Sequence, residues 1–232
     1  YNSLNYAYHI CKKYNLVGIV TLPLRKDLII SNINSKFIGQ TEFFQKIDKK
    51  QISNMILYHK KLIVSPLTTH QSVKSISKTI RKKDYIYFKI LTLNKTLIRD
   101  FNINAPKILV SGLNPHAGEG GKIGNEEINY IIPSINKLIK AGVKVEGPKS
   151  ADSMLITKNI NKYDCFVFIT HDQALIPFKY ISKFTGINFT SNLDVIRVSP
   201  DHGTAYDLVN TNRGSDQSLI NCFKFIKKIS KN

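Results

Sequence analysis

Short apolar runs rich in β-branched residues alternate along this chain with longer segments of helical periodicity. Glycine, proline or polar residues bound the short runs, which is the pattern of buried strands. Strands that alternate with helices in this way favour an α/β fold with a largely parallel sheet. We expect strands at 16–22, 107–111, 164–170, 187–190 and 195–199, and a pair of strands within 51–64. We expect helices at 4–14, 126–141 and 215–229, and one or two helices within 71–99.

The composition permits one folded unit and gives no sign of a membrane or secretory context. The chain has 232 residues, of which 42% are hydrophobic, so a core can form within a single region, 1–232. No apolar stretch approaches the roughly 20 residues that cross a bilayer, and residues 1–13 lack the pattern of a signal peptide. Three widely separated cysteines, Cys11, Cys165 and Cys222, form no evident disulfide framework. We therefore expect a reducing, cytoplasmic compartment and no membrane partner.

The net charge of +18, from 34 basic and 16 acidic residues, would by itself suggest a nucleic-acid partner. Lysine outnumbers arginine 29 to 5, however, and asparagine and isoleucine are also abundant, which is typical of an A+T-rich genome. The basic pairs are scattered and lack the interleaved aromatic residues of a strand-binding platform. We expect no nucleic-acid partner, and a basic nucleic-acid-binding protein remains a rival hypothesis.

Three histidines follow expected strands, where an α/β sheet presents its site. They are His70, His116 and His171. Neutral imidazole is the commonest ligand for a catalytic divalent ion, and three protein ligands leave one position open for substrate. The residues alone leave two interpretations open: a shared metal site, or separate histidines that form structural hydrogen bonds.

A glycine-rich loop at 112–124 contains five glycines in 13 residues and lies between an expected strand and an expected helix. Glycine permits positive φ and a close backbone approach, which suits a loop wrapped around a phosphate or a cofactor. The loop matches neither the phosphate-binding P-loop nor the dinucleotide fingerprint. A tight surface loop is the alternative interpretation.

The same loop carries a resemblance to a known family. The string GLNPHAGEGGKIGNEE, residues 112–127, is similar to the signature loop of the 4-hydroxythreonine-4-phosphate dehydrogenases. Further segments follow in the family's order: VTLPLRKDLI at 20–29, GQTEFF at 39–44, TTH at 68–70, GPKSAD at 147–152, HDQ at 171–173 and INFTSNLDVIRVSPDHGTAYDL at 187–208. The resemblance covers nearly the whole chain.

The resemblance implies the fold of the isocitrate and isopropylmalate dehydrogenases, with two α/β lobes around a cleft. The N-terminal part of the first lobe is then missing, and 1–232 is expected to form a single, N-terminally incomplete catalytic region. The family works as a homodimer with active sites at the interface. We therefore expect a second copy of the chain as a partner.

The resemblance also implies site residues. The implied metal ligands are His70, His116 and His171, which would hold a divalent ion such as Zn, Mg or Co. The implied substrate contacts are Gln40, Thr41, Lys179, Asn188 and Arg197. Asp152 and Asp172 match acidic positions near the family's site and are the candidate catalytic residues. Asp172 would orient an imidazole or act as the base, and a salt bridge is its alternative role. No residue is assigned to the cofactor.

The implied reaction belongs to pyridoxine 5′-phosphate (vitamin B6) biosynthesis. NAD or NADP would oxidise 4-phosphooxy-L-threonine, a small phosphorylated hydroxy-amino acid, to 2-amino-3-oxo-4-phosphooxybutanoate. This product then decarboxylates to 3-amino-2-oxopropyl phosphate. A divalent ion on the substrate hydroxyl favours the alkoxide from which hydride leaves.

Gln40 is one departure from the family, which has a histidine at this position. Glutamine can hydrogen-bond a phosphate but carries no charge. Two rival functions follow. One is a sister dehydrogenase for another phosphorylated sugar acid, such as threonate or erythronate phosphate, and the other is a non-catalytic remnant of the same fold.

Overall fold

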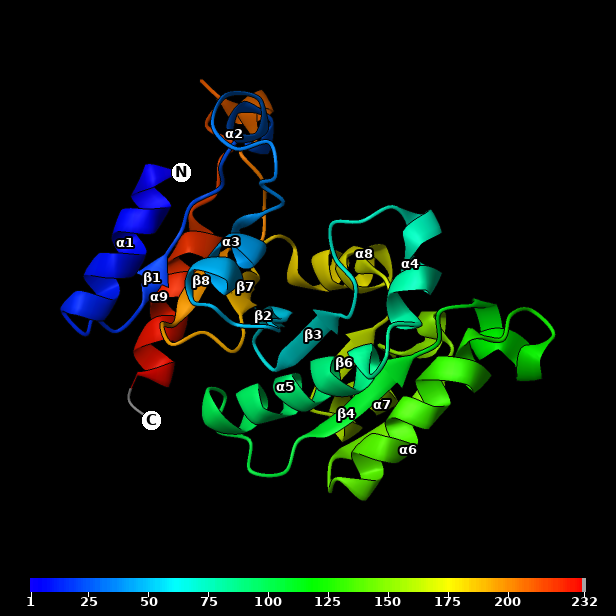
Figure 1. Ribbon diagram of the computed structural model, residues 1–232. Coiled ribbons are helices and arrows are strands. Elements are labelled where there is room, and N and C mark those ends of the chain that lie inside the picture. Colours follow the sequence, from blue (N-terminus) through cyan, green and yellow to red (C-terminus); the bar gives the residue numbers. More distant parts are fainter. Residues whose placement is uncertain (231–232) are drawn as a thin grey trace.

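The computed structural model describes residues 1–230 as one eight-stranded sheet with helices on both faces (Figure 1). The last two residues of the expected region 1–232, Lys231 and Asn232, lie outside the described residues. The strand order is β1-β8-β7-β2-β3-β6-β4-β5. The strands are β1 (Ile19–Val20), β2 (Met55–His59), β3 (Leu62–Pro66), β4 (Lys107–Ser111), β5 (Lys144–Lys149), β6 (Cys165–Phe168), β7 (Ile187–Thr190) and β8 (Arg197–Pro200).

The sheet is mixed rather than largely parallel. The strands β3, β6, β4 and β5 pair in parallel, and so do β1 and β8. The strands β8, β7, β2 and β3 pair antiparallel in the middle. The reason is local: only Lys60 and Lys61 connect β2 to β3, and Lys60 adopts a φ of 54°. A two-residue loop can join antiparallel strands but not parallel ones.

The helices bury alternate faces of the strands. In β4, Ile108 and Val110 pack with residues of α4, α5, α6 and α9, whereas Leu109 packs on the opposite face with α8. The side chains alternate because successive residues of a strand point to opposite sides of the sheet. The helices are α1 (Asn2–Lys13), α2 (Lys26–Asn32), α3 (Gln40–Ile47), α4 (Val73–Ile80), α5 (Tyr85–Arg99), α6 (Ile132–Lys140), α7 (Thr157–Lys162), α8 (His171–Ser182) and α9 (Gln217–Ile229). Short helical turns are η1 (Pro115–Gly121), η2 (Glu127–Ile131), η3 (Ala151–Ser153) and η4 (Tyr206–Leu208).

Most of the expected elements are confirmed, with α4 and α5 dividing the segment 71–99. The expected strand 16–22 is shorter, since β1 pairs only with β8. The helices α2, α7 and α8 and the strand β5 were not expected. Pro177 lies inside α8, and an interior proline argues against a helix in the sequence. The capping box of Thr170 and Gln173 at the start of α8 is the signal that favours one. The helix expected at 126–141 begins with the π-helical turn η2.

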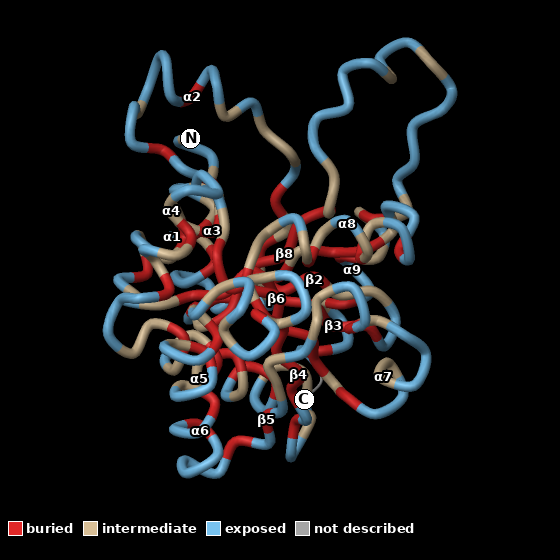
Figure 2. The backbone as a smooth tube through the Cα atoms, turned by 90° about the vertical axis from the view of Figure 1, so that its right-hand side faces the viewer, coloured by how far each residue is buried: buried red, intermediate tan, exposed pale blue. Residues whose placement is uncertain are grey.

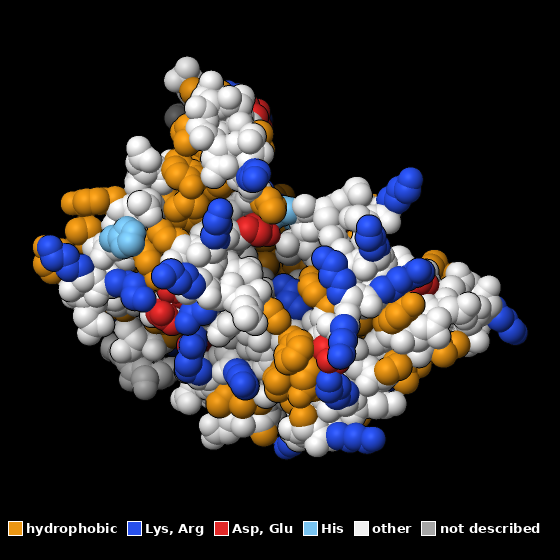
Figure 3. Space-filling view, viewed as in Figure 1, with side chains coloured by type: hydrophobic (Ala, Val, Ile, Leu, Met, Phe, Trp, Pro, Cys, Tyr) orange, Lys and Arg blue, Asp and Glu red, His pale blue; other side chains and the backbone are white. Residues whose placement is uncertain are grey.

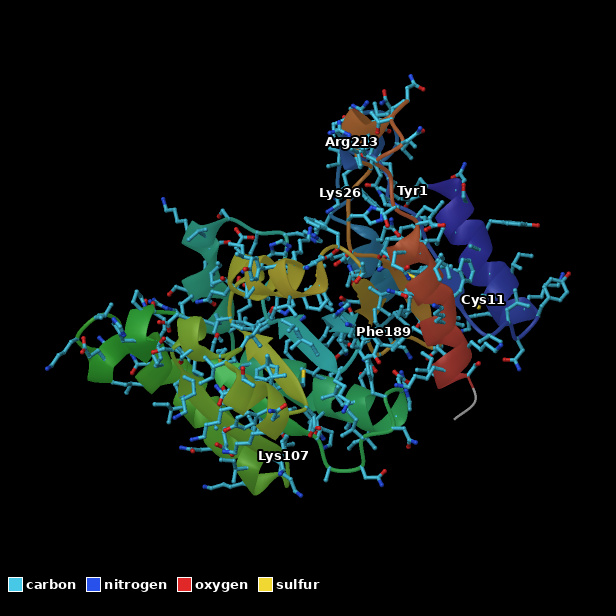
Figure 4. The ribbon with its side chains drawn as sticks, turned by 180° about the vertical axis from the view of Figure 1, so that it is seen from behind. Tyr1, Cys11, Lys26, Lys107, Phe189 and Arg213 are labelled. Carbon is cyan, nitrogen blue, oxygen red and sulfur yellow. The ribbon has the colours of Figure 1, made fainter. Side chains whose placement is uncertain are left out.

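Two segments project from one side of the sheet, α2 and the loop 203–215 (Figure 2). Figure 4 labels Lys26 and Arg213 on this raised part of the molecule. The guanidinium of Arg25 lies 5.7 Å from the ring centroid of Tyr206, which links the two segments. The projection stands beside the end of the sheet where the candidate site lies.

Lysine and arginine side chains are dispersed over the face drawn in Figure 3 and do not merge into one basic patch. A dispersed positive charge gives weak support to the nucleic-acid rival, because strand binding needs a continuous basic groove. Within residues 1–230, no helix has both the length and the apolar character needed to span a bilayer.

Candidate active site

A cavity of about 310 Å³ lies where β7 and β8 meet the first turns of α3 and α8. All five residues that the resemblance assigns to the substrate line it, namely Gln40, Thr41, Lys179, Asn188 and Arg197. Two of the three implied metal ligands, His70 and His171, also line it. The fold therefore gathers seven implied site residues from distant parts of the chain, while their roles stay predictions.

Arg197 is the largest fully buried side chain of the described chain, with 2% of its surface exposed. Its Nε and Nη2 atoms donate to the hydroxyl of Thr21 at 3.0 and 2.7 Å. Nη1 donates to the hydroxyl of Thr190 at 3.0 Å, and Nη2 also donates to Oε1 of Gln40 at 2.7 Å. All of these acceptors are neutral, so the hydrogen bonds fix the guanidinium without neutralising its charge.

Burial lowers the pKa of Arg197 from its ordinary value to about 10. The guanidinium remains charged at neutral pH, and an uncompensated buried charge is costly. The side chain lines the cavity, where an anion could supply the missing charge. Arginine suits this purpose because its planar fork matches carboxylate and phosphate oxygens. This arrangement predicts an anionic ligand.

His70 and His171 face each other with ring centroids 6.1 Å apart. Each Nδ1 lies beside a carboxylate oxygen, Oε1 of Glu42 at 3.1 Å for His70 and Oδ1 of Asp172 at 2.7 Å for His171. When Nδ1 donates to a carboxylate, Nε2 is left as a lone-pair donor, which is the usual arrangement of metal-bound histidine. The pair therefore fits a divalent ion. Lys26 Nζ lies 3.3 Å from Nε2 of His70 and would have to move aside.

Glu42 is the partner of His70 and is mostly buried. Burial alone would raise its pKa, but the hydrogen bonds from His70 and Thr69 more than offset this, and the pKa lies below the ordinary value. Glu42 is therefore ionised and can hold the imidazole of His70 in one orientation. The sequence alone predicts no role for Glu42.

His116 does not reach this cavity. It lies in η1, whereas the cavity is lined from α3, α8, β7, β8 and the segments beside them. Among residues 1–230, no three histidine, cysteine, aspartate or glutamate side chains gather closely enough to hold a metal ion. One chain thus does not bring His70, His116 and His171 together, and a complete site would need His116 from elsewhere.

The two candidate catalytic acids lie on the far side of His171. Asp152 and Asp172 line a separate hollow of about 490 Å³, together with Thr170, Gln173 and Ile176. Asp172 contacts the His171 imidazole, so its geometry suits an orienting role. Asp152 is exposed in the turn η3. Neither acid lines the cavity around Arg197.

Several residues of the cavity were missed in the sequence. Lys26, Ser199, Asp201 and His202 line it. They follow β1 or end and follow β8, so the strand-end rule that drew attention to the histidines would have found them. Burial raises the pKa of Asp201. Within the described residues, Oδ1 of Asp201 and Oδ1 of Asn188 are buried without a hydrogen-bond partner.

A second cavity, of about 950 Å³, adjoins the first and shares Pro23, His202 and Gly203 with it. Its other lining residues come mainly from the projecting loop and include the apolar Leu208 and Val209 and the basic Arg213. The volume is that of a site for a larger organic ligand. The two cavities together form a continuous recess at one end of the sheet.

Comparison with solved structures defines the class of fold. The chain superposes on isocitrate dehydrogenase from Methylococcus capsulatus with a TM-score of 0.50 at 10% identity, covering 90% of this chain and 67% of that one. The expected isocitrate dehydrogenase-like fold is thereby confirmed. The likeness is greater to 4-hydroxythreonine-4-phosphate dehydrogenase from Klebsiella pneumoniae, with a TM-score of 0.84 and 31% identity over 98% of this chain and 69% of that one.

Sequence comparison defines the family. The 4-hydroxythreonine-4-phosphate dehydrogenase of Aquifex aeolicus is 39% identical over 215 residues, which are 93% of this chain and 66% of the relative. The family model of the pyridoxal phosphate biosynthetic protein PdxA matches residues 1–226, and the chain belongs to this family. The resemblance seen in the sequence is confirmed. The chain spans between 55% and 66% of the length of the curated relatives it matches.

Proposed function

We propose that the protein oxidises 4-phosphooxy-L-threonine with NAD or NADP and a divalent metal ion. The product, 2-amino-3-oxo-4-phosphooxybutanoate, then loses CO₂ to give 3-amino-2-oxopropyl phosphate. The observation that carries the proposal is the buried guanidinium of Arg197, whose hydrogen-bond acceptors are all neutral, in a small cavity lined by the family's substrate residues. The names of the relatives agree with a phosphorylated hydroxy-amino acid as the substrate.

The phosphate of the substrate would bind beside Arg197. Lys179 adds a second positive charge to the same cavity, and Thr41 lies in the first turn of α3. Backbone N–H groups at a helix N-terminus attract anions, so this turn favours a phosphate as well. The cavity volume of about 310 Å³ suits a small substrate rather than a polymer.

The amino group of the substrate distinguishes the proposal from the sister dehydrogenase for threonate or erythronate phosphate. Asn188 and Asp201 each bring a buried, unpartnered oxygen to the walls of the cavity. A buried acceptor without a donor costs free energy. An ammonium group offers three N–H donors and a positive charge, whereas the hydroxyl of a sugar acid offers one donor. These acceptors therefore favour the amino acid substrate.

His70 and His171 would hold the metal ion, with His116 supplied by a second copy of the chain. This assignment follows from the facing pair of imidazoles and from the absence of His116 among the residues that line the cavity. It supports the expected homodimer with shared sites. When bound, a divalent ion lowers the pKa of the substrate hydroxyl and stabilises negative charge on its oxygen.

The second cavity would hold the nicotinamide cofactor. Pro23, His202 and Gly203 line both cavities, so a ring bound in the second cavity would lie next to a substrate bound in the first. Leu208 and Val209 offer an apolar surface to a ring, and Arg213 offers a charge to a cofactor phosphate. When bound, the cofactor accepts the hydride from the substrate carbon.

The protein's own groups then handle the proton. Asp172 would hold the His171 imidazole in one orientation. Because neither Asp172 nor Asp152 lines the substrate cavity, either acid would accept the hydroxyl proton through intervening water. The hydroxyl loses this proton as its carbon loses hydride, which leaves a ketone. The β-keto acid releases CO₂, and the same carboxylic acid can return a proton to the product carbon.

The test is NADH or NADPH formation by the full-length protein supplied with Mg²⁺, Zn²⁺ or Co²⁺. We expect turnover of 4-phosphooxy-L-threonine that a chelator abolishes, and much slower turnover of threonate 4-phosphate. A preference for threonate or erythronate phosphate would establish the sister enzyme instead. Loss of turnover with every substrate and metal, in a protein that still binds phosphate, would point to a non-catalytic remnant.

A further inference from the structure

The loop that carries His116 has an unusual backbone. Residues His116, Ala117, Gly118, Glu119, Gly120 and Gly121 have φ angles of 51°, 53°, 77°, 44°, 66° and 96°. They form a left-handed helical turn, which places Cβ close to the following carbonyl oxygen in L-residues. This conformation costs roughly 1–2 kcal/mol for each residue other than glycine. The turn therefore needs strong interactions to hold it.

Glu127 provides such interactions from the first position of η2. Its side chain is buried, with 2% of the residue exposed. Oε1 accepts the backbone N–H groups of Leu113 and Asn114, both at 2.8 Å. Oε2 accepts a hydrogen bond from Nδ2 of Asn114 at 2.9 Å. One carboxylate thus fixes the two residues that lead into the left-handed turn.

The glycines of the loop leave the space for this carboxylate. A Cβ on Gly118 would lie 2.6 Å from Oε2 of Glu127, and one on Gly112 would lie 3.0 Å from Oε1. A Cβ on Gly124 would lie 2.3 Å from Nδ2 of Asn114. The glycines at 112, 118 and 124 are therefore needed because the loop is packed around the Glu127–Asn114 pair.

We propose that Glu127 is a positioning residue that holds His116 in the left-handed turn and so presents its imidazole to the metal site of a second chain. The inference rests on the proposed role of His116 as a metal ligand. The proposal explains why the loop is rich in glycine without requiring a bound phosphate, because the Glu127 carboxylate fills the interior of the loop. Fixed orientation matters because a ligand that must be ordered on binding loses affinity.

Glu127→Gln tests the proposal, with Glu126→Gln as a matched control. Glutamine keeps the size of the side chain but places an N–H₂ group where an acceptor is needed. Glu126 adjoins Glu127, and within the described residues it accepts hydrogen bonds from the side chains of Ser77 and Asn114 and pairs with Arg81, but it accepts none of the loop's backbone N–H groups. The probe is Co²⁺, titrated into each full-length protein and followed by its visible absorption, which reports the ligand set.

We expect Glu127→Gln to weaken Co²⁺ binding by about 10- to 100-fold, the usual effect of losing a residue that supports a metal ligand. Its Co²⁺ spectrum should change toward fewer nitrogen ligands. Amide exchange at Leu113 and Asn114 should accelerate in this variant. Glu126→Gln should keep the parent spectrum and bind within about 3-fold of the parent.

Three outcomes would overturn the inference in different ways. In Glu127→Gln, amide exchange could become faster while Co²⁺ affinity and the Co²⁺ spectrum stay unchanged. That result would show that the hydrogen bonds to Glu127 do not position His116 for the metal site, and it would leave the proposed function intact. A parent protein that binds no Co²⁺ would overturn the proposed metal centre itself. A Glu126→Gln protein as weak as Glu127→Gln would show that the two residues act only through general stability.

Discussion

Arg197 and Glu127 are two buried charges that the fold treats in opposite ways. Each has only 2% of its surface exposed. The hydrogen-bond partners of Glu127 are N–H groups of the loop it supports, and both of its oxygens are engaged. Arg197 is held by the hydroxyls of Thr21 and Thr190 and by the amide of Gln40, and it lines an open cavity.

The difference separates a structural charge from a binding charge. A carboxylate surrounded by donors is stabilised by its own chain and has no need of a ligand. The guanidinium of Arg197 has neutral hydrogen-bond acceptors and feels the Glu42 carboxylate only at a distance, so within the described residues it has no ion-pair partner until an anion binds. Burial alone therefore does not mark a functional residue. The decisive observation is whether the surrounding groups satisfy the charge or only orient it.

The largest expected effect is on catalysis by Arg197→Met. Truncating one partner of a buried charge contact costs about 2–5 kcal/mol, so kcat/KM should fall by roughly 30- to 5000-fold. The same change removes an unpaired buried charge, and the protein should be as stable as the parent or more stable by about 1–3 kcal/mol. Steady-state kinetics and urea unfolding measure the two effects. A variant that is both inactive and strongly destabilised would mean that Arg197 has a structural role.

Lys89 is a half-buried charge whose titration should make stability depend on pH. Burial lowers its pKa from 10.5 to about 8, and its Nζ donates to the carbonyl of Ser53 at 2.7 Å. Above pH 8 the folded protein releases a proton that the unfolded chain keeps until about pH 10.5. Stability relative to Lys89→Met should therefore rise from pH 8 to 10.5, by at most roughly 3 kcal/mol. Parallel unfolding curves across this range would contradict the burial of the ammonium.

Glu127→Gln should act on stability in the direction opposite to Arg197→Met. Losing a charged acceptor for backbone N–H groups costs about 1–3 kcal/mol. Urea unfolding of the parent, Glu127→Gln and Glu126→Gln should place only Glu127→Gln well below the parent. If Glu127→Gln had the same free energy of unfolding as the parent, Glu127 would not be the structural charge that the comparison with Arg197 requires.

Gln40→His should have the smallest effect. Gln40 accepts from Arg197 and donates to the carbonyl of Leu22 at 3.0 Å, so it orients the guanidinium from the edge of the cavity. A histidine would add a charge-assisted bond to phosphate when protonated, worth about 1 kcal/mol. KM should fall several-fold below about pH 6.5 and change little above it. Identical pH profiles would mean that residue 40 contacts Arg197 but not the phosphate.

The sequence predicted most of the strands, because their apolar runs are short and sharply bounded. It could not predict their order, since the antiparallel centre depends on the hairpin at Lys60 and on pairings between distant strands. The residues that line the cavity were found through the resemblance. Asp201 and His202 also follow a strand, but the strand-end pattern was applied only to the three segments that contain His70, His116 and His171, so these two residues were not predicted.

The sequence also could not predict the burial and the hydrogen-bond partners of Glu127 and Arg197. The sequence around Glu127 does not show that its carboxylate is buried under the glycine-rich loop. An acidic residue in the first turn of a helix is equally expected to be exposed and to interact with the helix dipole. The same holds for Arg197, whose neighbours Thr21 and Gln40 lie more than a hundred residues away. Hydrogen-bond satisfaction is a property of the folded chain.

Calorimetric titration tests most directly whether Arg197 is a phosphate-binding charge. The full-length parent and Arg197→Met would each be titrated with 4-phosphooxy-L-threonine and with unphosphorylated 4-hydroxy-L-threonine, with metal present and no nicotinamide cofactor. We expect the parent to bind the phosphorylated compound at least about 100-fold more tightly, and Arg197→Met to lose most of this preference. An equal preference for the phosphorylated compound in both proteins would contradict the account.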